Sequence, residues 1–375
     1  MNSKPGICII TYPRPQASIV PLTNLVRILS ELSGYFYIIT GNEAKQVIDD
    51  KKNIHGCSFD YKVNRFFLLR IFAHIILQLN ICFKILQINR KTDIYLFFMG
   101  EGLILPMLTC KLLRKPVVLA LAGSLSKITA DDRDFLTKLY VLMEESNYWL
   151  ADGIIVYSKN LIEQWGLQIF SSKVHIAHEH IIDFNRFKIN KVPPAELVIG
   201  YVGRFSSEKG IMNFVQAISL VYRVRPDIHF LIAGDGPLKP ALEKFLLDQG
   251  LSSAVKLTGW ICHDNLPEHF RKLNLFVLPS YTEGLPNIML EAMACGIPVL
   301  ANCVGTIPDI IKDGKTGFLM EDNSPECIFK NIMRVVSNTD VHRIALNGYM
   351  IVRNEFTFET AKDTYKNVLD AIMKS

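Results

Sequence analysis

Two carboxylates in the C-terminal half of the chain could bind the hydroxyl groups of a ligand. Glu283 and Glu291 stand in the stretch 279–298, PSYTEGLPNIMLEAMACGIP, and a Gly-Leu-Pro break follows the first glutamate directly. A carboxylate can accept two hydrogen bonds at once, which suits a pair of neighbouring hydroxyls. The two acids therefore indicate a ligand that carries several hydroxyl groups.

The elements expected around these acids add a place for phosphate. The apolar run 273–278 predicts a buried parallel strand, and Pro286 suits the first turn of a helix that residues 296–298 close. Glu283 would then lie on the loop and Glu291 about one and a half turns into the helix. Backbone N–H groups at a helix start bind anions, so a nucleotide sugar fits this combination. The alternative is that the glutamates only complement the helix dipole.

Strand and helix patterns alternate along the whole chain. Apolar runs predict buried strands at residues 6–11, 35–40, 93–98, 116–121, 153–158, 197–202, 228–233, 255–260 and 273–278. The 375 residues suffice for two domains with separate cores, and the turn chemistry of residues 191–195, with its Pro-Pro pair, marks their boundary. The pattern predicts an α/β protein with two doubly wound parallel-sheet, Rossmann-like domains, in which ligands bind beyond the carboxyl ends of the strands.

The sequence resembles the family 4 glycosyltransferases, the retaining glycosyl transferases group 1. Residues 280–320, SYTEGLPNIMLEAMACGIPVLANCVGTIPDIIKDGKTGFLM, are similar to the donor-site signature of that family. Residues 197–210, LVIGYVGRFSSEKG, are similar to its G-R-x5-G motif, and residues 174–188 resemble its passage between domains. The resemblance implies the GT-B arrangement, in which two domains face each other across a cleft. It assigns residues 1–190 to the acceptor-side domain, 191–357 to the donor domain and 358–375 to a helix that crosses back.

The resemblance also implies roles for individual residues. Arg204 and Lys209 would grip the donor diphosphate, where preorganised cations stabilise the negative charge that develops on the leaving group. Because two fixed cations can do this without Mg²⁺, we expect no essential metal and no cofactor. Glu283 would lie near the sugar hydroxyls as the third catalytic residue, and Glu291 would bind the ribose. The other expected donor-binding residues are Gly203, Gly234, Asp235, Gly236, Trp260, Ile261, Gly284, Leu285 and Pro286.

Two N-terminal loops are expected on the acceptor side, and both differ from the family pattern. The first holds Arg14 and Ser18 where many members have a pair of glycines. The second holds Gly123 and Ser124 after Ala122, at which many members have a histidine near the reacting sugar. No histidine is therefore expected to act in this loop.

Composition and charge restrict the partners and the compartment. Residues 1–127 hold 16 lysines and arginines against 7 acidic residues, whereas the rest of the chain has four more acidic than basic residues. A basic, apolar N-terminal part suits an anionic membrane surface, and no nucleic-acid-binding motif is recognisable. The alternative is an ordinary solvated basic face. The eight scattered cysteines form no C-x-x-C pair and no secretory signal is evident, which indicates reduced thiols and a cytoplasmic protein.

Residues 65–91, RFFLLRIFAHIILQLNICFKILQINRK, form the most apolar segment. Their longest uncharged run, 71–83, is shorter than the roughly 20 residues that span a bilayer. The flanking cations are typical of a helix that lies in the membrane interface. A core helix of the N-terminal domain is the alternative, and both hold if one face packs inward while the other touches lipid.

These observations predict a glycosyltransferase that moves a sugar from a UDP- or GDP-linked donor to an acceptor hydroxyl with retention. The acceptor would be a glycan or a lipid-linked glycan. One alternative is a sugar-nucleotide 2-epimerase of the same fold, for which His178, Glu179 and His180 are the visible acid/base groups. These three residues could also suggest a metal site, but no further ligand has suitable spacing. A second alternative is a non-catalytic nucleotide-sugar-binding subunit.

Overall fold

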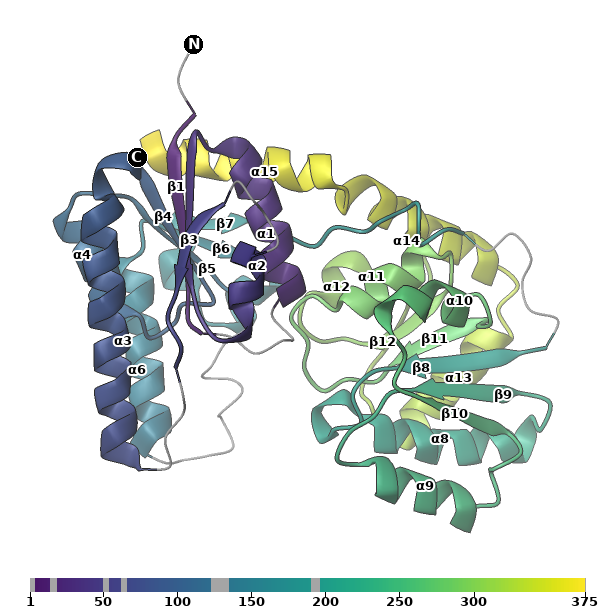
Figure 1. The fold of residues 1–375 in the computed structure, drawn as a ribbon. Helices are drawn as coiled ribbons and strands as arrows, with labels where there is room; N and C mark the ends of the chain where they lie inside the picture. Colours follow the sequence, from purple (N-terminus) through teal and green to yellow (C-terminus); the bar gives the residue numbers. More distant parts are fainter. Residues whose placement is uncertain are drawn as a thin grey trace. The chain divides into compact units, whose positions relative to one another are not determined.

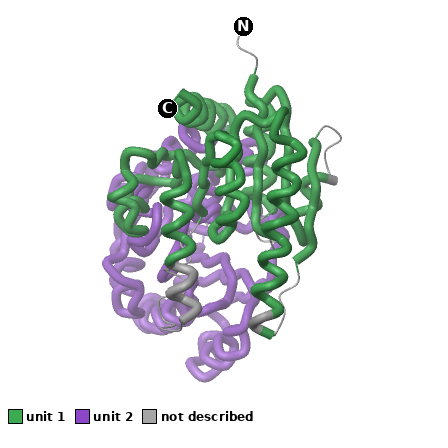
Figure 2. Tube along the Cα trace, turned by 90° about the vertical axis from the view of Figure 1, so that its left-hand side faces the viewer, with its two compact units in different colours: residues 1–181, 358–375 green, residues 182–357 purple. Residues whose placement is uncertain are grey.

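The structure, a computed structural model, describes residues 4–13, 19–49, 54–61, 66–122, 135–189 and 196–374 (Figure 1). The chain divides into two compact units (Figure 2). The first comprises residues 1–181 and 358–375, and the second comprises residues 182–357. Each unit is built on one parallel sheet, which confirms the predicted fold class.

The sheet of the first unit has seven strands in the order β3-β2-β1-β4-β5-β6-β7. They are β1 (Gly6–Thr11), β2 (Tyr35–Thr40), β3 (His55–Ser58), β4 (Ile94–Phe98), β5 (Val117–Ala120), β6 (Gly153–Val156) and β7 (Val174–Ile176). Every pairing is parallel, and in the centre Ile9 pairs with Ile38 on one side and Leu96 on the other. Strands β1 and β4 are buried throughout because helices cover both faces of the sheet.

The helices of the first unit form two layers (Figure 1). One face of the sheet carries α3 (Phe67–Ile88), α4 (Ile104–Leu112) and α6 (Phe135–Leu150), with α3 against α4 and α4 against α6. The other carries α1 (Ile19–Leu32), α2 (Gln46–Asp49) and the final helix α15 (Phe358–Lys374), which packs on α1. A short helix, α7 (Asn160–Gln164), precedes β7. The core side of α15 buries Tyr365, Leu369 and Ile372.

The second unit has six strands in the order β10-β9-β8-β11-β12-β13. They are β8 (Val198–Val202), β9 (His229–Ala233), β10 (Val255–Gly259), β11 (Leu275–Leu278), β12 (Val299–Asn302) and β13 (Phe318–Met320). One face of this sheet is covered by α8 (Ile211–Val224), α9 (Lys239–Asp248) and α13 (Pro325–Val336). The other face is covered by α10 (Leu266–Phe270), α11 (Asn287–Ala294), α12 (Ile307–Ile310) and α14 (Val341–Glu355) (Figure 1). The core between sheet and helices is apolar, with Tyr201, Phe214 and Phe230 almost fully buried.

The second unit begins at Ile182, nine residues before the predicted boundary at residue 191. The backbone N–H of Ile182 donates to the carbonyl of Phe356 at 2.9 Å, and Arg186 pairs with Asp264 at 2.8 Å. Both partners belong to the second unit, so these contacts tie residues 182–189 to it. The Pro-Pro pair, Pro193 and Pro194, lies outside the described residues.

Candidate functional site

Most of the predicted donor-binding residues follow the strands of the second sheet at its carboxyl edge. Residues 203–210 follow β8, residues 234–238 follow β9, residues 260–265 follow β10 and residues 279–286 follow β11. Since all six strands are parallel, these loops emerge at the same edge. This is the edge at which ligands bind in open α/β sheets.

Two glycines bring the neighbouring loops against residues 279–286. Gly210 has a φ of 65°, and a Cβ there would overlap the carbonyl oxygen of Pro279. Gly305 has a φ of 58°, and a Cβ there would overlap the carbonyl oxygen of Glu283. The left-handed backbone and the close approach both require glycine. The loop that carries Glu283 is therefore held between the loops after β8 and β12.

Lys209 and Glu283 form an ion pair at the centre of this edge. The Nζ of Lys209 lies 2.7 Å from Oε1 of Glu283, and the exposed fractions of the two side chains are 29% and 8%. The backbone N–H of Tyr281 donates to the carbonyl of Glu208 at 2.9 Å, which joins the two loops next to the ion pair. A buried carboxylate thus fixes the position of a half-exposed cation.

Arg204 lies in the same loop as Lys209, with its side chain exposed. Its carbonyl accepts a hydrogen bond from the Tyr201 hydroxyl at 3.0 Å, and burial raises the pKa of that hydroxyl, which keeps it protonated. In the part of the chain that the structure describes, the Arg204 guanidinium has no ion pair. Burial opposes the ionisation of Glu208, but a 2.6 Å hydrogen bond from Ser206 and the cations of Lys209 and Arg204 lower its pKa. The two predicted cations therefore share one acidic neighbour.

Glu291 has a partner that the sequence did not suggest. Its Oε1 lies 2.7 Å from Nε2 of His263, and the Glu291 side chain is 8% exposed against 53% for His263. The hydrogen bond to Glu291 raises the pKa of His263, although partial burial opposes this. His263 follows β10 in the sequence ICHDN, where an isolated histidine carries no spacing signal. The carboxylate predicted to bind ribose is therefore held by a titratable side chain.

Residues 182–189 pack against the loop that carries His263. The ring of Phe187 lies 5.7 Å from that of His263, and Arg186 pairs with Asp264. The last part of the passage 174–188 therefore supports the partner of Glu291 within the second unit.

Glu179 and His180, earlier in the passage, are buried in the first unit, and His178 is partly buried. Glu179 is fully buried and accepts hydrogen bonds from the Tyr157 hydroxyl at 2.7 Å and the Tyr365 hydroxyl at 3.5 Å. Burial raises the pKa of Glu179 to about 7 and lowers that of His178 to about 4. His180 is 5% exposed. Glu179 thus links the segment after β7 to α15.

The other predicted donor-binding residues take distinct positions on the edge. Trp260 is 75% exposed, and Leu285 is buried. The carbonyl of Gly284 accepts hydrogen bonds from both the N–H and the hydroxyl of Thr306, at 3.1 and 2.7 Å. Pro286 was predicted in the first helical turn, but its extended backbone makes it the residue before α11, which begins at Asn287. The remaining members, all on the loops defined above, are Gly203, Gly234, Asp235, Gly236 and Ile261.

The predicted acceptor-side residues cannot be placed in the same way. Arg14, Ser18, Gly123 and Ser124 lie outside the described residues. Over the described ranges, no group of three or more histidine, cysteine, aspartate or glutamate side chains is arranged to hold a metal ion.

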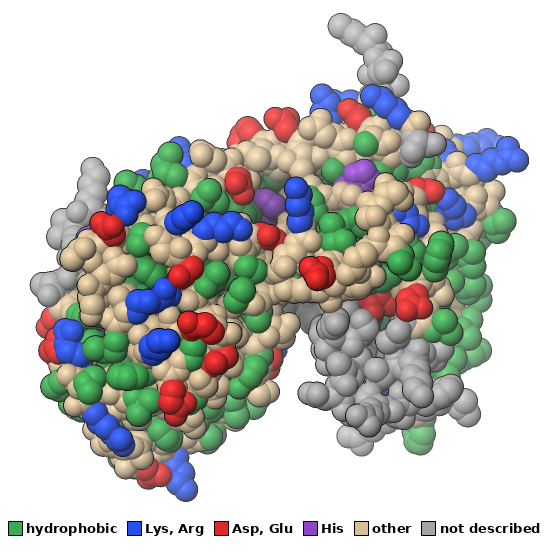
Figure 3. Space-filling model, turned by 180° about the vertical axis from the view of Figure 1, so that it is seen from behind, with side chains coloured by type: hydrophobic (Ala, Val, Ile, Leu, Met, Phe, Trp, Pro, Cys, Tyr) green, Lys and Arg blue, Asp and Glu red, His purple; other side chains and the backbone are tan. Residues whose placement is uncertain are grey.

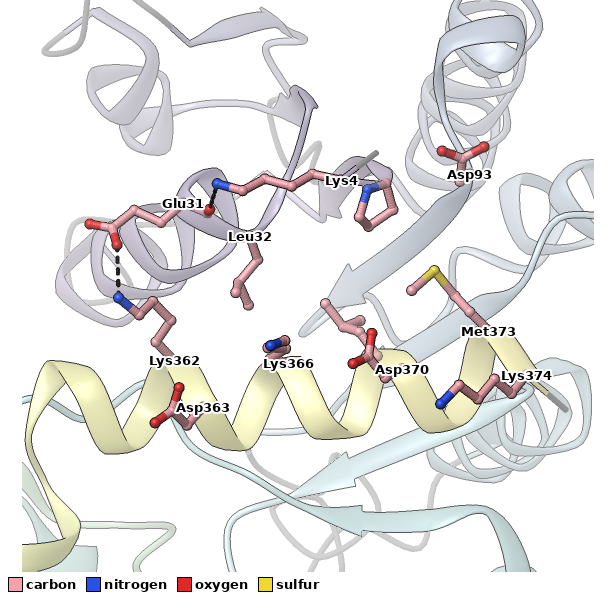
Figure 4. A pocket seen from close by; sticks show the side chains of 12 residues that line it. Lys4, Glu31, Leu32, Asp93, Lys362, Asp363, Lys366, Asp370, Met373 and Lys374 are labelled. Atoms are coloured by element: carbon pink, nitrogen blue, oxygen red, sulfur yellow. Dashed lines mark hydrogen bonds and ion pairs between the residues drawn. The ribbon is translucent and has the colours of Figure 1, made fainter. Parts of the chain in front are cut away.

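A groove of about 930 Å³ lies elsewhere, in the first unit (Figure 4). It is next to the amino ends of β1 and β4, and Lys362 on α15 pairs with Glu31 on α1 at 3.2 Å across it. Four lysines and four acidic residues line the groove, so its charges balance. None of the predicted site residues lies there, and we do not assign the donor site to it.

A family match falls within the second unit, which carries the charged carboxyl edge. Residues 196–338 match the family described as Glycosyl transferases group 1. The chain is 31% identical over 167 residues to alpha-D-kanosaminyltransferase of Streptomyces kanamyceticus, and the match covers 44% of this chain and 43% of that protein. It is 26% identical over 252 residues to the capsular polysaccharide biosynthesis glycosyltransferase CapM of Staphylococcus aureus, covering 62% and 65%. The chain thus spans less than two thirds of the length of these relatives.

Solved structures confirm the fold along the whole chain. HepE of Anabaena, solved in complex with UDP and glucose, matches with a TM-score of 0.75 at 18% identity, covering 99% of this chain and 100% of HepE. The lipopolysaccharide outer core galactosyltransferase WaaB in its apo form matches with a TM-score of 0.72 at 18% identity, covering 98% and 99%. At such identities the likeness establishes the fold, which is of the GT-B type.

Proposed function

We propose that this protein transfers a sugar from a nucleoside diphosphate to an acceptor hydroxyl with retention of the anomeric configuration. The observation that carries the proposal is the Lys209–Glu283 ion pair at the carboxyl edge of the second sheet. It lies within residues 196–338, the range that matches the glycosyl transferases group 1 family. Ion pairs are common on protein surfaces, but here the acid is buried and the cation stays accessible.

In the proposed reaction, the bond between the anomeric carbon and the diphosphate oxygen breaks, and the acceptor oxygen bonds to the same face of that carbon. The leaving phosphate oxygen takes the proton of the acceptor hydroxyl, so no protein base is required. Arg204 and Lys209 stabilise the charge that develops on the diphosphate, because fixed cations need no reorganisation during the reaction. With these two cations in place, we expect turnover without a divalent metal.

The carboxylates serve binding in this scheme. Glu283 orients Lys209 through their ion pair, and we assign it to the hydroxyls of the sugar. Glu291 accepts hydrogen bonds from the ribose hydroxyls, in exchange for or beside its bond to His263. The loop after β10, with the exposed ring of Trp260, would lie near the base.

The donor is proposed to be UDP- or GDP-linked, which the UDP complex of HepE supports for the uridine case. A role in cell-surface or lipid-linked glycan synthesis is supported by two relatives. CapM is a capsular polysaccharide biosynthesis glycosyltransferase, and LpsE of Rhizobium meliloti, 26% identical over 190 residues, is a lipopolysaccharide core biosynthesis glycosyltransferase.

The proposal is tested by following donor and product anomers by NMR. The purified chain is supplied with UDP-glucose or GDP-mannose and with alkyl glycosides as acceptors, without metal and in the presence of EDTA. We expect a new α-linked product from an α-linked donor, and at least about a hundredfold loss of turnover in Arg204→Ala. Lys244→Ala, an exposed lysine on α9, is the matched control and should keep full activity.

Other products would overturn the proposal in identifiable ways. A donor epimerised in the absence of acceptor would indicate an isomerase. Nucleotide binding without turnover of any donor would indicate a binding subunit, and an inverted product linkage would contradict retention.

A further inference from the structure

Helix α3 exposes an unusual amount of apolar surface. Leu69, Phe72, Ile76, Leu79, Phe83 and Leu86 follow one another at steps of three and four residues, so they form a single stripe along the helix. Each of them is between 42% and 64% exposed. A single exposed leucine needs no explanation, but a continuous apolar stripe of this length marks an interaction surface.

The neighbouring helix α4 extends this surface. Leu105, Leu108 and Leu112 are 37%, 39% and 84% exposed, and α4 packs directly against α3. In Figure 3, hydrophobic side chains gather along the right-hand edge of the view, which belongs to the first unit. We call this combined surface, the α3 stripe with the three leucines of α4, the α3–α4 face.

The opposite side of α3 is built into the first unit. Leu77, Ile81 and Ile85 are at most 4% exposed, and the side-chain oxygen of Gln78 accepts a hydrogen bond from the N–H of Leu105 at 2.9 Å. The segment Leu69–Lys91 is long and apolar enough to cross a membrane. However, crossing would require α3 to abandon these contacts and uncover the core of its own domain. A helix fixed on one side and apolar on the other fits the surface of a bilayer instead.

The charges around the α3–α4 face are mostly basic, although Lys111 pairs with Asp152 and Lys115 lies 4.0 Å from Asp93. Residues 66–92 and 104–122 contain no aspartate or glutamate, but they hold seven lysines and arginines. Arg90, Lys91 and Arg114 are exposed at the ends of the two helices, where the strands of the sheet begin. Long basic side chains beside an apolar surface are suited to reach lipid phosphates while the apolar groups enter the acyl region.

The apolar stripe and the basic residues beside it indicate which partner binds the α3–α4 face. We propose that the α3–α4 face docks the protein onto an anionic lipid bilayer, with α3 lying in the plane of the interface. A second copy of this chain would place like charges opposite each other in a symmetric contact, which is unfavourable. The proposal does not depend on the proposed transferase activity, because it rests on residues of the first unit alone.

Vesicle flotation tests the proposal with the full chain. Vesicles of phosphatidylcholine alone are compared with vesicles of phosphatidylcholine and phosphatidylglycerol. We expect the wild type to float with the anionic vesicles. The double variant Phe72→Ser with Phe83→Ser should bind at least about tenfold more weakly, since two exposed rings no longer enter the acyl region. Leu247→Ser, at a 71% exposed leucine of α9, is the matched control and should float like the wild type.

A second pair of variants separates the charge contribution. Arg90→Gln with Lys91→Gln should weaken binding to the anionic vesicles about fivefold for each cation removed and leave the weak binding to neutral vesicles unchanged. Lys244→Gln is the control. Unchanged thermal unfolding of every variant, expected for exposed positions, establishes that binding and not folding has changed.

Three outcomes would overturn the proposal. The wild type could fail to float with either vesicle. It could be a dimer in solution that the two phenylalanine substitutions dissociate, which would make a second copy the occupant. It could also resist extraction from membranes by alkaline carbonate, which would mean that α3 crosses the bilayer.

Discussion

The Lys209–Glu283 pair joins an accessible cation to a carboxylate that is almost completely removed from water. Such a pair can serve structure, function or both, because removal of one partner leaves the other unsatisfied. The Lys209 side chain stays 29% exposed, so the pair leaves the lysine within reach of a ligand. The two contributions can be separated by substitution.

The first prediction concerns this pair. Lys209→Ala should lower the free energy of unfolding by about 1–3 kcal/mol, because Glu283 then stays buried without its partner, and it should lower turnover at least about a hundredfold. The double variant Lys209→Ala with Glu283→Ala should regain much of the stability but none of the turnover. Urea denaturation and initial rates measure the two effects. If the double variant were as active as the wild type, the pair would have no catalytic role.

The second prediction concerns the hydrogen bond between His263 and Glu291. The raised pKa of His263 means that the protonated histidine is favoured in the folded state. The stabilisation that it contributes is therefore fully present below its ordinary pKa of 6.5 and is lost as the pH rises through the raised value. Urea denaturation across this range should show that His263→Asn is less stable than the wild type at low pH and equal to it at high pH.

A matched control for this prediction is His342→Asn on α14, at an exposed histidine. Its stability, measured over the same pH range, shows how much of any pH dependence follows from removing an imidazole elsewhere in the chain. A pH-independent difference for His263→Asn would show that the histidine acts by packing against Phe187 rather than by its charge.

The residues of the site differ in how far the sequence predicts them. The two acids and two cations stand in motifs with fixed spacing, and the structure places all four at one edge of the second sheet. His263 could not be predicted, because its partner lies 28 residues further along the chain and only the folding of the sheet brings the two together. The predicted position of Pro286, in the first turn of the helix, was wrong for a different reason. A proline fits both the first helical turn and the extended residue before it, so its type alone does not decide between them.

At the scale of elements, glycines determine how closely the loops of the edge approach one another. The third prediction compares two glycines with nearly equal φ angles, Gly210 at 65° and Gly250 at 66°. Alanine at Gly250 meets no atom within 4 Å and should cost about 1 kcal/mol of stability from backbone strain alone. Alanine at Gly210 also meets the carbonyl of Pro279, so it should cost more and weaken nucleotide binding.

Thermal unfolding and nucleotide titration of the two variants check this prediction. The result expected is a larger loss of stability for Gly210→Ala, together with weaker binding that Gly250→Ala does not share. Equal effects of the two substitutions would mean that the approach of the two loops is unimportant for the site.

The nine predicted strands are all present. Most of them are apolar because helices bury both faces of the sheet, whereas the edge strand β10 has alternate residues exposed. The sequence analysis did not predict β3, β7, β12 and β13, which have three or four residues each. Of these, β3 and β7 are edge strands with half-exposed side chains. The segment of α3 was ambiguous for a physical reason, since it is apolar on both its buried and its exposed side.

At the scale of the whole molecule, the chain forms two units with separate cores, and α15 returns to the first of them. The basic and apolar surface belongs to the first unit, whereas the residues proposed to bind the donor belong to the second. This division explains why the sequence predicts the donor site in detail and the acceptor only by class. The match to the glycosyl transferases group 1 family covers residues 196–338, and the acceptor-side loops lie outside the described residues.

The most direct test of the donor site is a thermal-shift titration of the full chain with UDP, GDP, ADP and TDP. Binding to the folded state raises the unfolding temperature as ligand concentration exceeds Kd. We predict that UDP or GDP raises the unfolding temperature of the wild type and of Lys244→Ala, and that Arg204→Ala and Glu291→Ala lose most of this shift. Unfolding temperatures that none of the four nucleotides changes, or shifts that persist in both site variants, would contradict a nucleotide-sugar site at this edge.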